Sequence, residues 1–192
     1  QNNVFDTHLS KLFGQRNQND KHQTEFLCEA SADFGMDAIG VGERDLNYGL
    51  AFLHEMMEKH NLPFTSANVR EAKSGELVAP EYLVIERGGV RFGIVSVLDP
   101  SQRIIAMTQQ DEEFTIADPV ATLRELVPRI RQEADTIVLV GHLGDSHTEA
   151  VVREVTGIDI SVVGHSHRNV STERLVGDTM LLCSAYEGRY VG

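Results

Sequence analysis

Residues 158–167 read Ile-Asp-Ile-Ser-Val-Val-Gly-His-Ser-His, a largely apolar run that ends in a glycine and two histidines. Such a short apolar run before a turn is typical of a buried parallel strand. Gly164 allows the backbone to turn sharply in front of the histidines. Residues two apart in extended backbone point to the same side, so His165 and His167 could face one pocket.

Two upstream segments repeat this arrangement. The apolar run 136–140 leads into Gly141-His142-Leu-Gly144, and the run 37–42 leads into Glu43-Arg44-Asp45. Ligands of such sheets bind beyond the carboxyl ends of the strands. The sequence therefore predicts that the ionisable side chains of the three turns converge on one cavity. Imidazole nitrogens and carboxylate oxygens suit a divalent transition metal.

Each turn alone has an ordinary alternative. A single histidine after a strand, such as His142, is often structural or solvated. His165 and His167 could have a capping or packing role in the structure. Residues 43–45 could be a cluster of ionic side chains on the surface. His147 stands at the start of a predicted helix. It could support the metal ligands from outside without binding the metal itself. The joint occurrence of three strand-glycine-ligand turns in one small chain favours a metal site.

The remaining pattern predicts the rest of the fold. Helices are expected over 24–34, with Phe26 and Phe34 on its apolar side, over 50–60 and over 146–155. Another helix is expected from Asp118-Pro119 onward, and its apolar residues are Leu123, Leu126, Val127 and Ile130. A strand is expected over 64–69. Glycine turns at 88–89 and 177–178 predict two antiparallel hairpins. Helices that alternate with buried strands, interrupted by hairpins, predict an α/β fold with a mixed β-sheet flanked by helices. Residues 1–21 are polar and irregular and are expected to be a loop.

Composition limits the partners. The 192 residues suit one domain, and 41% are hydrophobic, which is enough for a sizeable core. A net charge of −12 makes nucleic acid and anionic membranes poor partners. No apolar run approaches the ~18 residues that a membrane span needs. Cys28 and Cys183 are expected to be buried thiols, with a disulfide as the alternative.

At these turns the chain resembles the calcineurin-like metallophosphoesterases. That family carries Asp-x-His, Gly-Asp, Gly-Asn-His-Glu, Gly-His and Gly-His-x-His motifs, each after a strand. In its 5′-nucleotidase branch the third motif continues as Gly-Asn-His-Glu-Phe-Asp-x-Gly, to which the segment 42–49, Gly-Glu-Arg-Asp-Leu-Asn-Tyr-Gly, is similar. The resemblance runs from about residue 23 to the end of the chain. Further matches are Ser66-Ala-Asn-Val69, His142-Leu-Gly144, Gly157-Ile-Asp159, Gly164-His-Ser-His167 and the closing segment 186–192.

The resemblance implies a layered metallophosphoesterase-type domain over 1–192 that hydrolyses phosphate esters, with nucleotides among the candidate substrates. It implies two divalent metal ions, of Mn, Zn, Fe or Mg. His142 and His165 would bind one of them together with Glu43, which occupies the family's Asn position, and His167 would bind the other. Asp45 and His147 would support these ligands, and a periplasmic or extracellular location is expected.

The departures from the family pattern concern two regions. The opening strand with Asp-x-His and the Gly-Asp motif are expected to be missing from 1–192, and Asp6-Thr-His8 is interpreted as a decoy because no apolar strand precedes it. Arg44 occupies the position of the family's catalytic histidine. A guanidinium cannot donate a proton at ordinary pH, but it binds phosphate well. The alternative hypothesis is a catalytically degenerate member that acts as a binding or scaffold module.

Overall fold

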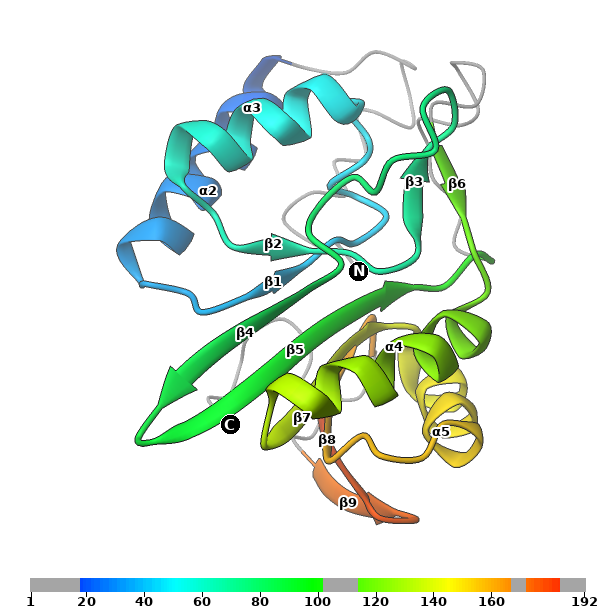
Figure 1. Ribbon diagram of the computed structural model, residues 1–192. Helices are drawn as coiled ribbons and strands as arrows, with labels where there is room; N and C mark the ends of the chain where they lie inside the picture. The colour runs from blue at the N-terminus through cyan, green and yellow to red at the C-terminus, as the bar shows by residue number, and fades with distance from the viewer. Residues whose placement is uncertain (1–17, 102–113, 167–171, 184–192) are drawn as a thin grey trace.

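The computed structural model describes residues 18–101, 114–166 and 172–183 (Figure 1). A six-stranded sheet in the order β4-β5-β7-β8-β10-β9 forms its centre. Strands β5, β7, β8 and β10 run parallel, and the edge strands β4 and β9 pair antiparallel with β5 and β10. The mixed α/β architecture predicted from the sequence is therefore confirmed. The strands are β4 (Tyr82–Arg87), β5 (Val90–Leu98), β7 (Thr136–His142), β8 (Ile160–Gly164), β9 (Thr172–Val176) and β10 (Thr179–Cys183).

The helices lie in two groups. Helices α4 (Pro119–Glu133) and α5 (Gly144–Glu154) cover one face of the large sheet, while α2 (Gln18–Asp33) and α3 (Leu50–His60) lie together at the other end of the molecule (Figure 1). Two small sheets accompany the second group. One is the parallel pair β1 (Ile39–Gly40) and β2 (Phe64–Thr65), and the other is the antiparallel pair β3 (Val69–Glu71) and β6 (Phe114–Ile116).

Helix α4 shows how the sequence fixes an element against the sheet. The side chain of Asp118 accepts a hydrogen bond of 2.7 Å from the backbone N–H of Ala121, and Pro119 fills the first helical position, as predicted. Its buried face also matches the prediction. The helix lies so close to β5 that a Cβ added at Gly93 would lie 2.2 Å from Cγ2 of Ile130. The buried residues of that face include Leu123, Leu126, Val127 and Ile130.

Strand β1 lies across the opposite face of the sheet. A Cβ added at Gly40 would lie 2.9 Å from Cγ1 of Val140 in β7 and 3.0 Å from Cβ of Ser96 in β5. This close approach brings the turn after β1 to the carboxyl ends of β5 and β7. The residues that follow Gly42 are thereby placed at the same sheet edge as His142.

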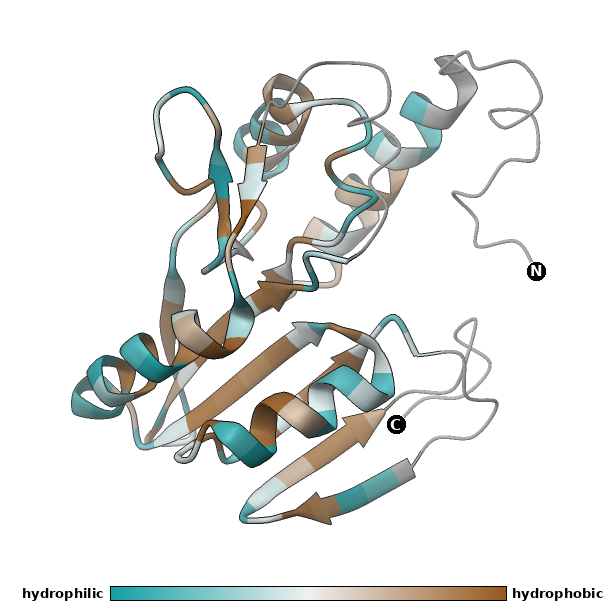
Figure 2. Ribbon diagram, turned by 90° about the vertical axis from the view of Figure 1, so that its right-hand side faces the viewer, coloured by the Kyte–Doolittle hydropathy of each residue, from teal (hydrophilic) through white to brown (hydrophobic). Residues whose placement is uncertain are grey.

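The apolar residues form two clusters. The larger fills the space between the large sheet and helices α4 and α5, and the smaller joins α3 to the small sheets. Figure 2 shows the long strands as hydrophobic along most of their length and the outer sides of the helices as hydrophilic. Cys183 is a buried thiol, as expected, whereas the thiol of Cys28 is only half-buried. Among the described residues, no helix is both long and apolar enough to cross a bilayer.

Three sequence predictions require correction. Helix α2 begins at Gln18, so residues 18–21 of the expected loop 1–21 are helical. Phe26 and Phe34, expected on the packed side of this helix, are 66% and 83% exposed, because periodicity does not show which side meets the core. The expected strand 64–69 is divided into β2 and β3. Between these two strands, the backbone N–H groups of Ser66 and Ala67 donate hydrogen bonds to the carbonyls of Pro80 and Ser96. The two residues therefore do not join β2 and β3 into one continuous strand.

Asn68 lies between β2 and β3, and its side-chain hydrogen bonds lead to a testable prediction. It is fully buried, its Nδ2 donates to the carbonyls of Leu98 (2.8 Å) and Ala117 (2.9 Å), and its Oδ1 accepts from the N–H of Leu98 (2.9 Å). The Asn68→Ala variant leaves these groups buried without partners. We expect the free energy of unfolding, measured in urea, to fall by about 2–4 kcal/mol.

Two further variants complete this measurement. Asn68→Asp keeps the acceptor but loses both donors, so it should be destabilised as well. The exposed Gln23→Ala variant should stay within about 0.5 kcal/mol of the parent. An Asn68→Ala protein as stable as the Gln23→Ala control would show that the side chain does not hold β3 to β5.

Candidate metal centre

The structure brings together Glu43, His142 and His165. Each offers one ligand atom, and the three atoms lie within 4.8 Å of one another. Glu43 follows β1, His142 is the last residue of β7, and His165 follows β8 directly. His142 pairs with Gly164 in the parallel register of β7 and β8, which places the two imidazoles side by side. We call these three residues the triad. His167, predicted to join them, lies outside the described residues, as do Asp6 and His8.

The contacts within the triad fit a cation. Nε2 of His142 contacts Oε2 of Glu43, and Nδ1 of His165 lies 3.7 Å from Oε1. The two ring centroids are 5.1 Å apart. Oε2 of Glu43 and Nε2 of His142 are buried and face each other, and neither forms a hydrogen bond with any other residue that the structure describes. A divalent metal ion would accept both atoms as ligands.

Glu43 is charged in this environment. Its exposed fraction is only 7%. Burial raises the pKa of its carboxyl, but the neighbouring His142 and His165 imidazoles and its own backbone N–H lower it, to about 2 overall. The side chain is therefore a carboxylate at neutral pH, which is the form that binds a metal ion.

Asp45 shapes the turn that carries Glu43. Its Oδ2 accepts a 2.8 Å hydrogen bond from the N–H of Gly42, and its own N–H donates to the Gly42 carbonyl at 3.2 Å. Burial raises the pKa of Asp45 to about 6, although the bond from Gly42 opposes this shift. Glycine at position 42 leaves room for the His142 ring, since an added Cβ would lie 3.3 Å from it and would require a small shift of the ring.

His165 adopts an unusual backbone conformation. Its φ of 57° lies in the left-handed region, which is uncommon for residues other than glycine and is often found at functional sites. The first turn of α5 holds this segment. The hydroxyl of Ser166 donates to Oδ2 of Asp145 at 2.7 Å, and a Cβ added at Gly144 would lie 3.5 Å from the His165 carbonyl oxygen.

Arg44 lies beside the triad. Its Nε is 3.5 Å from Oε1 of Glu43, and its side chain is 31% exposed. The local ion pair considered in the sequence analysis is therefore present. A guanidinium that is partly open to solvent next to the carboxylate could also bind an anion that approaches the triad.

His147 contacts a residue that the sequence analysis missed. Its Nδ1 lies 2.5 Å from Oδ2 of Asp99, whose side chain is only 6% exposed. Oδ1 of Asp99 accepts a bond of 2.8 Å from the N–H of Ser101, and the N–H of Asp99 donates to the His142 carbonyl at 3.2 Å. Burial raises the pKa of Asp99, but the bonds from Ser101 and His147 outweigh it and keep the pKa below its ordinary value.

Asp99 does not belong to the strand-glycine-ligand pattern from which the site residues were predicted. It follows β5 directly, without a glycine between the strand and the carboxylate. The available signal was an acidic residue immediately after an apolar strand that neighbours β7 in the sheet.

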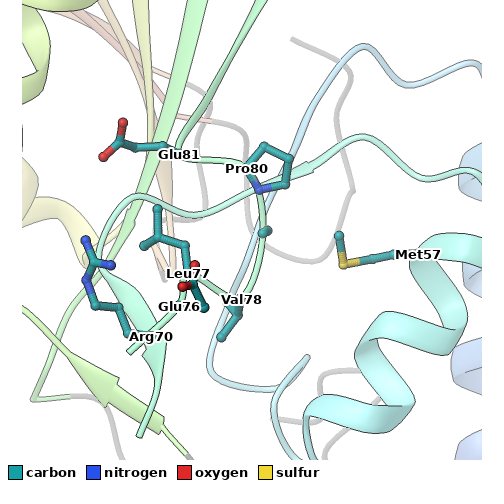
Figure 3. Close-up of a pocket in the computed structure, with 8 residues that line it drawn as sticks. Met57, Arg70, Glu76, Leu77, Val78, Pro80 and Glu81 are labelled. Atoms are coloured by element: carbon teal, nitrogen blue, oxygen red, sulfur yellow. The ribbon is translucent and has the colours of Figure 1, made fainter. Parts of the chain in front are cut away.

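A pocket of about 560 Å³ lies elsewhere, between Met57 of α3, Arg70 of β3 and the segment 76–81 (Figure 3). None of the triad residues lines it. Its lining also lacks a cluster of metal-ligating side chains, so it is not the candidate site.

Several proteins similar in sequence to this chain are named as nucleotidases or nucleotide phosphodiesterases. The chain is 29% identical over 150 residues to a 2′,3′-cyclic-nucleotide 2′-phosphodiesterase/3′-nucleotidase of Salmonella typhimurium, an alignment that covers 68% of this chain and 23% of that protein. It is 27% identical over 170 residues to a snake venom 5′-nucleotidase of Gloydius brevicauda, with 82% of this chain and 28% of that protein covered. The chain thus spans about a quarter of the length of these relatives. No family model matches it.

Structural comparison agrees at the level of the fold. The calcineurin-like phosphoesterase YfkN of Bacillus subtilis superposes with a TM-score of 0.71, at 19% identity, over 96% of this chain and 64% of that one. This similarity shows that the two proteins share a fold.

Proposed function

We propose that this chain, a relative of the calcineurin-like metallophosphoesterases of the 5′-nucleotidase branch, is the catalytic domain of a metal-dependent phosphoric ester hydrolase. The observation that supports this proposal most strongly is the triad. A buried carboxylate and two imidazoles from three separate turns gather at the carboxyl edge of the sheet, with a buried carboxylate oxygen of Glu43 and a buried ring nitrogen of His142 facing each other.

In this proposal each residue of the site has its own task. Glu43, His142 and His165 hold one divalent metal ion, and His167 contributes to a second. Bound metal ions supply positive charge to the phosphate and lower the pKa of water that would attack it. Arg44 binds phosphate oxygens as negative charge develops on them. Asp45 keeps the Glu43 turn in place through Gly42.

The substrate class follows from the relatives. Two of them are named for nucleotide substrates, so nucleoside monophosphates and cyclic nucleotides are the first candidates. The acidic chain repels such anions, and bound cations would offset that repulsion. A location outside the cytoplasm is part of the same proposal, and the venom protein supports it by its name.

Metal dependence tests the proposal. The purified protein that contains this chain would be stripped with a chelator and supplied with Mn, Zn, Fe or Mg in turn. Release of inorganic phosphate from 5′- and 3′-nucleoside monophosphates, and ring opening of a 2′,3′-cyclic nucleotide, would then be measured. We expect hydrolysis of at least one substrate to vanish on stripping and to return with one of the metals.

The alternative is a binding module that has lost catalysis, and Arg44 in the position of the family's histidine favours it. Metal binding at the triad without hydrolysis of any of these esters would support this alternative. Hydrolysis that survives complete removal of metal would contradict both hypotheses.

A further inference from the structure

The first turn of α5 is attached to both histidine-bearing segments of the triad. On one side, Gly144 lies against the His165 carbonyl and Asp145 accepts the hydrogen bond of Ser166. On the other side, His147 contacts Asp99, whose N–H donates to the carbonyl of His142. His147 is therefore tied, through Asp99, to the backbone of the triad member His142.

His147 and Asp99 differ sharply in exposure. The Asp99 side chain is 6% exposed, whereas that of His147 is 59% exposed. Both carboxylate oxygens of Asp99 have partners, with Oδ1 held by Ser101 and Oδ2 by Nδ1 of His147. A carboxylate at Nδ1 fixes the tautomer and the orientation of an imidazole and leaves Nε2 to exchange a proton.

The proposed reaction needs such a group. Departure of an alkoxide, such as a ribose oxygen of a nucleotide, is slow unless a proton reaches it. Arg44 lies beside Glu43, and a guanidinium is a hydrogen-bond donor that does not serve as a general acid. His147 combines an accessible imidazole with a buried partner that orients it.

We infer that His147, oriented by Asp99, is the general acid that protonates the leaving oxygen; this inference rests on the proposed function. The water oxygen forms the new bond to phosphorus, and the bond to the leaving oxygen breaks with its electron pair remaining on that oxygen. This oxygen takes the proton from Nε2 of the His147 imidazolium. The proton lost by the water passes to solvent, and solvent reprotonates His147, so that the products are an alcohol and phosphate.

The test compares two esters in the protein that contains this chain, loaded with metal. One is an alkyl phosphate or a nucleoside monophosphate, whose leaving oxygen needs a proton. The other is 2,4-dinitrophenyl phosphate, whose leaving oxygen does not. We expect His147→Gln to lower kcat for the first by about 100-fold or more, while the second changes by less than about threefold.

Asp99 and a remote histidine provide the matched variants. Asp99→Asn should reproduce the selective loss, and the double variant should lose little more than His147→Gln, because the two residues act as one unit. His22→Gln, an exposed change on α2, should leave both rates unchanged. Thermal melting of each variant checks that the fold is kept.

The outcomes separate the inference from the proposed function. An active parent with equal losses on both esters in His147→Gln, or with no loss at all, would overturn the assignment of His147 alone. A parent inactive on both esters with every metal would overturn the proposed function and the inference together. A selective loss in both single variants would establish the pair as the proton donor.

Discussion

The His142→Ala variant should lose tight binding of a divalent metal ion, and hydrolytic activity with it. The triad supplies three ligand atoms within 4.8 Å, and Nε2 of His142 lies directly against Glu43. Removing this imidazole takes away one ligand and a supporting contact of the buried carboxylate. Because loss of an outer partner alone costs 10–100-fold in metal affinity, we expect at least about 100-fold for a ligand itself.

Metal affinity would be measured by titration calorimetry on stripped protein, and the bound metal by elemental analysis. A second readout is the rise in melting temperature on adding metal, which follows from binding to the folded state and should disappear in the variant. His22→Ala serves as the control for removal of an exposed histidine. Parent-like affinity in His142→Ala would place the metal elsewhere and remove the main support of the proposed function.

The Arg44→Ala variant should lower kcat by about 10²–10³-fold, the usual cost of removing a donor to developing negative charge. Its Nε lies 3.5 Å from Glu43, so the guanidinium stands at the edge of the triad where phosphate would bind. Arg44→Lys should also lose much of the turnover, since an ammonium gives only a point charge in place of a planar fork. Arg44→His should recover part of it at mildly acidic pH, where imidazole is protonated.

The control for Arg44 is Arg124→Ala, which removes an exposed arginine of α4 paired with Glu154. It should leave both kcat and metal affinity unchanged. Equal rates for Arg44→Ala and the parent would show that the role of Arg44 is limited to its local ion pair with Glu43. A fall in metal affinity without a change in kcat at saturating metal would lead to the same conclusion.

Much of the sheet could be predicted because its strands are largely apolar and several of them end at or next to a glycine. The turn at 88–89 predicted the β4–β5 hairpin, and Asp118 with Pro119 predicted the start of α4. Helix α2 could not be predicted as well. Its start lies in polar sequence, and Phe26 and Phe34 point away from the core, which only tertiary packing determines.

The residues of the candidate site also divide into those that the sequence could predict and those that it could not. The strand-glycine pattern selected Glu43, His142 and His165, because parallel strands bring their carboxyl ends to one edge of the sheet. Asp99 was not selected, since its significance depends on a contact with His147, 48 positions away. The left-handed conformation of His165 was also invisible, because nothing in a histidine indicates a positive φ. Contacts between distant side chains leave no periodic trace in the sequence.

The parallel register of β5, β7 and β8 also governs when the site can form. Glu43, His142 and His165 come from distant parts of the chain and meet only after these strands have paired. Parallel pairing requires long loops to close, and the conformational entropy lost in closing them is offset only when the strand contacts form. Such pairing is therefore late and slow in folding. In the proposed function, a cation would therefore meet the complete triad only after these strands have paired. Its binding would then stabilise the assembled domain.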